Sequence, residues 1–253
     1  MKTLAVIPAR LGATRLPRKP LRLLGGLPLV IRVWERVRDS GVAVACVIAT
    51  DSPEVAEAAR AHGTPVELTS PDHPSGTDRV AEVAARPAYA GFGSVLNVQG
   101  DEPFVELDAL RGAVRMVTER GFALGTSAAM AGLDALMNPN VVKVVAADDG
   151  RAMYFSRAAI PFLREQEDAP VLRDRIWQHV GVYAYTRDAL ARWVALPPHP
   201  LERIERLEQL RPLAAGMAMG VACAAQAGRG GIDTEDDLVR ANAEWNTLNR
   251  GRH

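Results

Sequence analysis

The chain has 253 residues, 48% of them hydrophobic and 24% charged, and its 30 basic side chains balance its 30 acidic ones. This composition is typical of a globular protein, and the zero net charge gives no indication of nucleic-acid binding or of a membrane surface. No apolar run reaches the length of a membrane span, and the amino terminus lacks the apolar core of a signal peptide. We therefore expect no membrane insertion.

Cys46 and Cys223 are the only cysteines, and each lies within an apolar run. We expect two buried thiols in a reduced, cytoplasmic protein, although their positions alone leave a disulfide open. The five histidines are scattered, which argues against a zinc site.

Apolar runs alternate with amphipathic stretches through the first half of the chain. This alternation predicts a mostly parallel central sheet flanked by helices, a Rossmann-like α/β fold with right-handed crossovers. Ser52 and Pro53 mark the start of one helix as its cap and its first residue. The predicted strands are 4–7, 42–49, 65–68, 95–98 and 123–128, with Pro8 ending the first, and the predicted helices are 28–38, 53–62, 77–85 and 107–119.

The regular alternation breaks down from about Gly132 onward. We expect one domain over 1–253 that carries a small mixed α+β insertion, with a small mixed sheet within 161–177. The predicted strands here are 141–145, 152–155, 179–185 and 217–225, and the predicted helices are 201–210 and 236–248.

A basic loop follows the first predicted strand, in the stretch IPARLGATRLPRKP (7–20). Arg10, Arg15, Arg18 and Lys19 lie in it with no acidic residue among them. A cationic loop at the carboxyl end of a parallel strand is typical of an anion site, and guanidinium groups match phosphate oxygens. The stretch matches neither a Walker A loop nor a dinucleotide fingerprint. A solvated basic turn is the alternative.

A second informative stretch, VLNVQGDEP (95–103), ends an apolar strand in a carboxylate. Asp101 should lie at the carboxyl end of a central strand beside the basic loop, and Gly100 should let backbone approach a ligand. A carboxylate there is explained by Mg²⁺, which takes one or two carboxylates plus phosphate oxygens. The alternative is that Asp101 caps a helix entered through Pro103.

Two glycine turns could add to this site. In GGIDTED (230–236), Asp233 could reach the same cation, and Thr234 or Asp233 could instead cap the last helix. In SGTDR (75–79), amides and hydroxyls could bind a base or phosphate, and a capping turn explains the pattern equally well.

Several other polar residues have ordinary structural explanations from the sequence alone. His179, Tyr183 and Tyr185 alternate along one strand and should share a face, as a half-buried aromatic stripe would. Arg157 and the pair Glu208–Gln209 are compatible with ordinary surface positions.

Taken together, these stretches resemble the sugar-acid cytidylyltransferases, and among them those acting on 3-deoxy-manno-octulosonate (KDO). The resemblance runs in order from 4 to about 240. Its motifs are PAR (8–10), TRLP (14–17), KPL (19–21), VQGDEP (98–103), NPN (138–140) with Lys143, YFSR (154–157), HVGVY (179–183), PLE (200–202), LEQLR (207–211) and GIDT (231–234).

The resemblance implies transfer of a cytidylyl group from CTP to KDO with Mg²⁺ and release of pyrophosphate, a step toward lipopolysaccharide, by a homodimer. Arg10 and Lys19 would hold the triphosphate, with Arg15 adding charge, and Asp101 and Asp233 would ligate magnesium; Arg10, Lys19, Asp101 and Asp233 form the implied catalytic set. Pro8, Ser75, Arg79 and Gln99 would surround the cytidine. Arg157, His179, Tyr183, Glu208 and Gln209 would hold the sugar acid. The whole chain, 1–253, would form a single nucleotidyltransferase domain, in which roughly 132–212 contribute the sugar-binding and dimerisation subregion.

The chain departs from the family pattern at Arg18, where the family usually has glycine, and in the polar stretch that Leu11, Gly12 and Ala13 replace. The segment 165–177 matches no pattern and would admit a related acid sugar, amino-substituted or sialic-acid-like. A different class of function is also conceivable, that of a catalytically idle nucleotide-binding protein on the same fold. Such a protein should lack at least one of the metal-binding carboxylates, but both Asp101 and Asp233 are present. Nucleic-acid binding is disfavoured because no basic helix or aromatic-rich face accompanies the loop.

Overall fold

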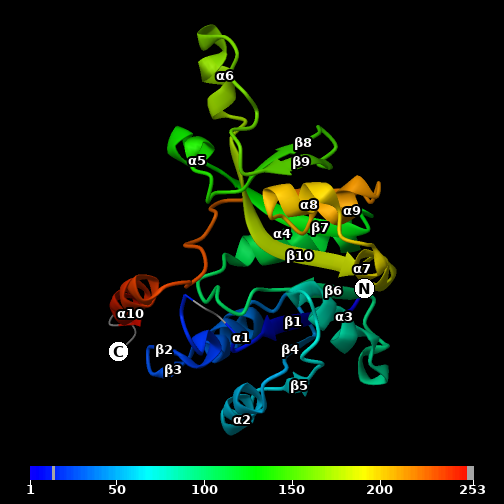
Figure 1. Ribbon diagram of the computed structural model, residues 1–253, viewed down its shortest axis with the longest axis vertical. Coiled ribbons are helices and arrows are strands. Elements are labelled where there is room, and N and C mark those ends of the chain that lie inside the picture. Colours follow the sequence, from blue (N-terminus) through cyan, green and yellow to red (C-terminus); the bar gives the residue numbers. More distant parts are fainter. Residues whose placement is uncertain (13–14, 250–253) are drawn as a thin grey trace. The chain divides into compact units, whose positions relative to one another are not determined.

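The computed structural model describes residues 1–12 and 15–249 (Figure 1). Ala13 and Thr14 of the basic loop therefore lie outside the described residues. The chain divides into two compact units. Unit 1 comprises Met1, Gly93–Leu96 and Glu106–Gly228, and unit 2 comprises Lys2–Phe92, Asn97–Val105 and the chain from Arg229 on.

Unit 2 is built on three parallel strands in the order β1–β4–β5: β1 (Thr3–Ala9), β4 (Ala45–Thr50) and β5 (Val66–Leu68). β1 is almost wholly buried, as expected for a central parallel strand. The helices of this unit are α1 (Leu29–Asp39), α2 (Pro53–Ala61), α3 (Gly76–Ala85) and α10 (Glu235–Asn249), with 3₁₀ turns at Lys19–Leu21 and Pro87–Tyr89.

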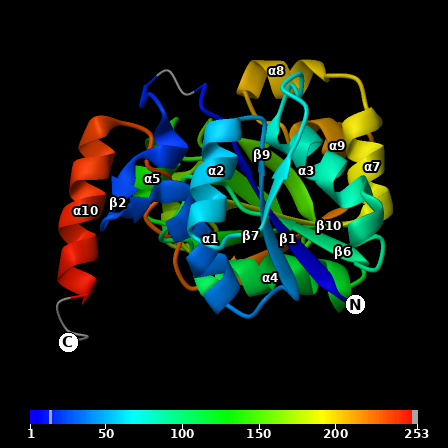
Figure 2. The same cartoon turned by 90° about the horizontal axis from the view of Figure 1, so that it is seen from below.

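A short hairpin of β2 (Leu23–Leu24) and β3 (Leu27–Pro28) joins the basic loop to α1. Helix α10 runs beside this hairpin (Figure 2). Leu16, Leu24, Leu29, Ile232 and Leu238 form one buried cluster. The cluster therefore joins the start of the chain to its last helix.

Unit 1 contains β7 (Leu124–Met130), which pairs in parallel with β11 (Met219–Ala224) and antiparallel with β10 (Trp177–Thr186). An antiparallel hairpin of β8 (Lys143–Ala146) and β9 (Ala152–Ser156) joins β10 through Lys143 and Gln178. β6 (Ser94–Asn97) begins in this unit. The helices are α4 (Leu107–Thr118), α5 (Leu133–Met137), α6 (Ala169–Arg173), α7 (Arg187–Ala195), α8 (Pro200–Glu205) and α9 (Leu210–Ala214).

The predicted fold class is confirmed: the central sheet is mostly parallel and helices flank it. The cap predicted at Ser52 is also confirmed, since its side chain accepts a hydrogen bond from Val55 N. Among the described residues, no helix combines the length and apolar character needed to cross a membrane.

The predicted end of the first strand at Pro8 was wrong, because β1 continues through Ala9 and pairs Pro8 with Ala49. A proline removes one N–H donor, but its carbonyl and its extended backbone still suit a strand.

Two predictions in the second half were wrong. Within 161–176 the structure has the 3₁₀ turn Gln166–Asp168 and helix α6 in place of a small sheet. Pro170 suits the first turn of a helix, and the segment is poor in β-branched residues. The single helix expected over 201–210 is two helices, since Arg206 adopts a left-handed conformation (φ +55°) that ends α8.

The cysteines are less buried than predicted. Cys46 is only partly buried, Cys223 is exposed, and both thiols are free. Cys223 lies on β11, whose alternate side chains face the core and the surface, so an apolar run did not imply burial there.

Candidate active site

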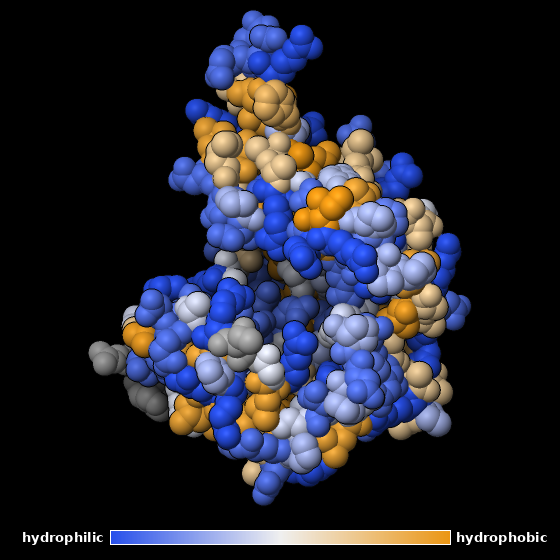
Figure 3. All heavy atoms as spheres, viewed as in Figure 1, coloured by the Kyte–Doolittle hydropathy of each residue, from blue (hydrophilic) through white to orange (hydrophobic). Residues whose placement is uncertain are grey.

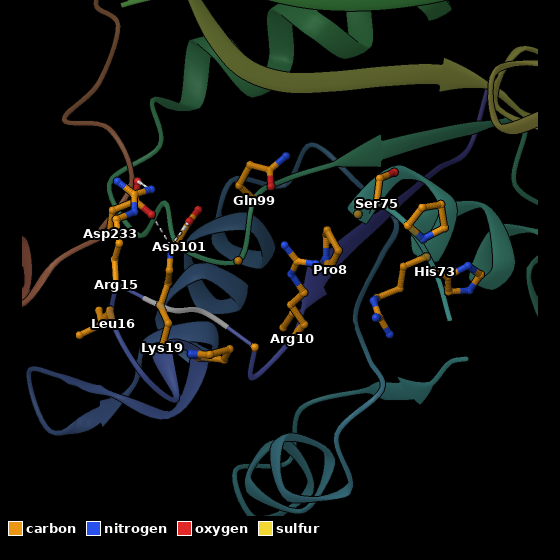
Figure 4. Close-up of a pocket in the computed structure, with 17 residues that line it drawn as sticks. Pro8, Arg10, Arg15, Leu16, Lys19, His73, Ser75, Gln99, Asp101 and Asp233 are labelled. Atoms are coloured by element: carbon orange, nitrogen blue, oxygen red, sulfur yellow. Dashed lines mark hydrogen bonds and ion pairs between the residues drawn. The ribbon is translucent and has the colours of Figure 1, made fainter. Parts of the chain in front are cut away.

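A cavity of about 480 Å³ lies within unit 2, at the carboxyl end of β1 (Figure 4). This volume suits a small-molecule ligand. The walls come from the basic loop, the start of α3, the turn after β6 and the loop before α10. Every residue predicted for the nucleotide and the metal lines this cavity: Pro8, Arg10, Arg15, Lys19, Ser75, Arg79, Gln99, Asp101 and Asp233.

Lys19 joins the two predicted metal ligands. Its ammonium Nζ donates hydrogen bonds to Asp101 Oδ2 at 2.5 Å and to Asp233 Oδ1 at 2.7 Å. The Lys19 side chain is only 14% exposed. Burial alone would lower the pKa of Lys19, but the two carboxylates outweigh it and raise the pKa, so the side chain is a cation. Two carboxylates and one ammonium thus share one point of the cavity wall.

Backbone contacts hold the two carboxylates together. Ile232 N donates to Asp101 O at 3.0 Å, which places the chain before Asp233 against the turn that carries Asp101. A Cβ on Gly231 would lie 3.3 Å from Asp101 Cγ, so a larger residue would crowd that carboxylate. The helix-cap explanation of Asp101 was wrong, because α4 begins only at Leu107.

Gly100 is required for packing against β1. A Cβ at this position would lie 2.7 Å from Pro8 O, closer than van der Waals contact allows. The predicted close approach of backbone at Gly100 is therefore made to the end of β1.

The basic loop is partly neutralised by acids from distant segments. Arg15 donates to Asp233 Oδ2 at 3.0 Å, and Arg18 pairs with Glu54 on α2. Arg10 is exposed, lines the cavity and makes no ion pair within the described part of the chain. Arg18 has φ +58°, in the left-handed region that favours glycine, the residue that the resemblance leads us to expect at this position.

The start of α3 forms another wall. Ser75 accepts hydrogen bonds from Thr77 N and Asp78 N, so the predicted capping turn is present, and its residues also line the cavity. Arg79 is 3% exposed, and its guanidinium is committed to Asp51 at 3.2 Å and to Thr69. Thr234 likewise accepts from Asp237 N and caps α10.

Sequence reasoning missed one part of the cavity wall, His73 and Pro74. His73 Nε2 lies 2.6 Å from Glu82 Oε2, and the same carboxylate oxygen accepts from Ser70 N at 2.9 Å. The only available signal was the polar stretch before Ser75. Glu102, next to Asp101, is also notable, because burial, followed by the neighbouring carboxylates, raises its pKa to about 7.

The residues predicted for the sugar all lie in unit 1. His179 and Tyr183 lie on β10 with ring centroids 5.4 Å apart, and Phe155 packs edge-on against His179. Burial lowers the pKa of His179 to about 3, so its ring is neutral. Tyr185 is fully buried, beyond the half-burial predicted for it. Arg157 follows β9, and Glu208 and Gln209 precede α9, with Gln209 3% exposed.

Comparison with known proteins gives the class to which this fold and site belong. The family model described as cytidylyltransferase matches residues 4–219. The chain is 65% identical, over 98% of its own length and 96% of the relative's, to a 3-deoxy-manno-octulosonate cytidylyltransferase of Gemmatimonas aurantiaca. It is 45% identical, over 94% and 93%, to one of Polynucleobacter asymbioticus.

A solved structure gives the same result. CMP:2-keto-3-deoxy-manno-octonic acid synthetase complexed with CTP matches with a TM-score of 0.90 and 34% identity, covering 98% of this chain and 100% of the other. The chain therefore belongs to the cytidylyltransferase family of nucleotidyltransferases, and within it to the 3-deoxy-manno-octulosonate cytidylyltransferases. A putative glucose-1-phosphate thymidylyltransferase from Bacillus anthracis, 14% identical with a TM-score of 0.64, shares the fold alone.

Glu82 should make the stability of the fold depend on pH. Burial opposes its ionisation, but hydrogen bonds from Ser70, His73 and Arg86 lower its pKa from 4.5 to about 2. Because the folded-state pKa is the lower one, the carboxylate stabilises the fold above pH 4.5, and this contribution is lost as the pH falls toward 2. We expect Glu82→Gln to reduce the free energy of unfolding at pH 7 by on the order of 1–3 kcal/mol, in the range for hydrogen bonds to charged groups.

Urea denaturation at several pH values measures this effect. The difference from the wild-type chain should shrink between pH 4.5 and 2, and Glu57→Gln, at an exposed position of α2, is the control. A difference independent of pH would contradict the prediction.

Proposed function

We propose that the chain transfers the cytidylyl group of CTP to the anomeric hydroxyl of KDO and releases pyrophosphate, with the help of Mg²⁺. The observation that carries this proposal is the convergence of Lys19, Asp101 and Asp233 in one cavity bordered by a basic loop. The names of the relatives and of the solved CTP complex support the two substrates.

The charges in the cavity suit phosphoryl chemistry. In an in-line attack on the α-phosphorus, negative charge grows on the leaving pyrophosphate, and fixed cations stabilise it. Of the four cations that line the cavity, Arg10 alone makes no ion pair with the described residues, so its guanidinium is available to the triphosphate at no cost in existing contacts. Lys19 and Arg15 can also bind the triphosphate once another cation neutralises the carboxylates with which they pair.

The remaining residues of the cavity would hold the cytidine. In Figure 4, Pro8 and Ser75 lie on the side away from the two carboxylates, and Gln99 lies between that side and Asp101. Arg79 also lines this cavity, but its guanidinium is held by Asp51 and Thr69. We propose that Arg79 keeps this wall rigid while the neighbouring groups contact the base.

The donor set at Asp101 and Asp233 fits a magnesium ion. Two carboxylates that converge on one cation, here the Lys19 ammonium, offer the hard oxygen ligands that Mg²⁺ prefers. Bound there, the ion would neutralise phosphate charge and orient the triphosphate. We propose that Lys19 holds this place when no nucleotide is bound and turns to the phosphates when CTP and the metal arrive.

The metal proposal predicts how Mn²⁺ binds. With CTP present, Asp101→Asn and Asp233→Asn should each weaken Mn²⁺ binding to the protein by at least about tenfold, because each removes an anionic ligand. Without CTP, Lys19→Met should bind Mn²⁺ more tightly than the wild-type chain, since the competing ammonium is gone. The relaxation enhancement of water protons by protein-bound Mn²⁺ measures both effects.

Glu235→Gln is the control, because this carboxylate lies near the site but pairs with Arg22. Equal Mn²⁺ binding by the wild-type chain and the two aspartate variants would show that Asp101 and Asp233 do not bind the metal.

We propose that Arg157, His179, Tyr183, Glu208 and Gln209 bind the sugar acid, with Arg157 facing its carboxylate. The neutral His179 ring suits a sugar hydroxyl better than an anion. The chain would work as a single nucleotidyltransferase domain in which 132–212 supply the sugar site and the dimer contacts. The two free thiols suit the reducing cytoplasm as its place of action.

A homodimer is supported by apolar side chains exposed on unit 1. Phe162 is 81% exposed, Met137 74% and Val171 63%. Apolar atoms gather at the base of α6 (Figure 3). Surfaces of this kind mark contacts between proteins. We expect a mass of two chains in sedimentation equilibrium, and Phe162→Glu should shift the protein toward the monomer. A wild-type monomer at micromolar concentration would contradict the homodimer.

The direct test of the function is product formation. CTP, Mg²⁺ and KDO should give pyrophosphate and a product with the mass of CMP–KDO, and leaving out Mg²⁺ should abolish it. Amino-substituted KDO and a sialic acid, tested in parallel, decide the sugar. Binding of CTP with no turnover of any of these acids would refute the proposed function.

A further inference from the structure

Lys143 is a fully buried cation that the proposed function does not use. Its Nζ donates three hydrogen bonds, to Asn138 O at 2.9 Å, to Val141 O at 2.7 Å and to Arg157 O at 2.6 Å. All three donors of the ammonium are satisfied, and every acceptor is a main-chain carbonyl. In the part of the chain that the structure describes, no carboxylate forms a salt bridge with Lys143.

A buried lysine without a carboxylate partner lowers the stability of the folded protein. Taking an ammonium out of water costs several kcal/mol, and carbonyl dipoles compensate less than a carboxylate would. Burial, followed by the charge of Arg157, lowers the pKa of Lys143, which is the sign of this cost. A methionine would fill nearly the same volume without it. What only the ammonium supplies is a set of three donors that draw three separate carbonyls to one point.

Those carbonyls belong to two segments. Asn138 and Val141 are in the loop before β8, whereas Arg157 follows β9. The same loop is shaped by its own hydrogen bonds, from Asn140 N to Asn138 Oδ1 and from Val141 N to Asn138 O. Lys143 therefore connects an ordered loop to the backbone of Arg157.

The loop also holds the Arg157 side chain. Its Nη1 donates to Pro139 O at 3.1 Å, and its Nε donates to Glu205 O at 2.8 Å. The guanidinium is thus oriented by two carbonyls, one of them in the loop that Lys143 fixes. A third link reaches β10, because His179 N donates to Val142 O at 2.8 Å.

Glu205 completes this support from the end of α8. Its carboxylate accepts from Arg157 N at 2.9 Å and from Ser156 Oγ at 2.6 Å. The backbone of Arg157 is therefore held on one side by Glu205 and on the other by Lys143, while its guanidinium is held by carbonyls of Glu205 and Pro139.

We propose that Lys143 is a positioning residue for the sugar acid, which it serves by fixing the loop 138–142 and thereby the direction of the Arg157 guanidinium and the place of His179. This inference rests on the proposed function, in which Arg157 and His179 contact the sugar acid. Lys143 itself, being fully buried, does not touch the substrate.

The test is the kinetics of Lys143→Met, with both substrates varied. Misplacement of a binding group by about 1 Å costs up to about 100-fold. We expect the KM for KDO to rise about 10- to 100-fold, while the KM for CTP stays within about twofold, because the nucleotide residues lie in unit 2. Arg157→Ala should show the same pattern, and the double variant Lys143→Met/Arg157→Ala should be no worse than Arg157→Ala alone.

That non-additivity separates positioning from loss of stability. Leu110→Ala, at a fully buried position of α4 outside the Lys143 contacts, is the control for a weakened fold. It should lower the Tm without changing the ratio of the two KM values. If Lys143→Met does not fold, Glu205→Gln carries the same test, since it weakens the other support of the Arg157 backbone.

Each outcome decides between the proposals. A wild-type chain that makes no product from CTP and any sugar acid refutes the proposed function, and the positioning role with it. If the wild-type chain makes product but the folded Lys143→Met variant has an unchanged KM for the sugar, the positioning role alone is refuted. If Lys143→Met does not fold, an unchanged KM for the sugar in Glu205→Gln refutes it. Additive losses in the double variant refute it as well.

Discussion

The contact on which the candidate site depends is the pair of hydrogen bonds from Lys19 Nζ to Asp101 and Asp233. These partners lie 82 and 214 residues away along the sequence, so only the fold can bring them together. The buried cluster containing Leu16 and Ile232 supplies the reason, because it packs the basic loop against the chain that leads into Asp233. Burial of the apolar side chains of the loop thus brings its charged side chain Lys19 next to Asp233.

Lys19, which is partly buried, and Lys143, which is fully buried, illustrate different uses of an ammonium group. Lys19 pairs with carboxylates that can exchange it for another cation, and it lines a cavity, so its contacts suit a group that moves during a reaction. Lys143 is surrounded by main-chain carbonyls that cannot be exchanged without unfolding a loop. We propose that the first arrangement serves binding and that the second serves support.

Much of the fold could be predicted because local patterns and tertiary packing agree. The apolar runs near β1, β4 and β7 and the cap at Ser52 lie where such patterns are most informative. The prediction failed where one residue decides the path of the chain. Pro8 continued a strand, and Arg206 divided a helix by adopting a positive φ that arginine rarely takes.

The candidate site shows the same division. The resemblance named the residues around the cavity, but it did not indicate that Arg79 is committed to Asp51 or that His73 forms a wall. The Arg79–Asp51 pair leaves no signal in the sequence, because only the fold brings the two side chains together, and the polar stretch before Ser75 was the only signal for His73. Gly100 was predicted to approach a ligand, whereas its missing side chain makes room for the carbonyl of Pro8.

The sequence by itself determined the class of protein, the basic character of the loop and the carboxylates available to it, because these depend on residue type and order. The tertiary structure alone decided which charges meet. Arg15, Arg18 and Lys19 are uncompensated along the sequence, and they acquire Asp233, Glu54 and Asp101 only when distant segments pack. Electrostatic interactions act through space over a few ångströms, so charge pairing at this site follows from packing and not from order along the chain.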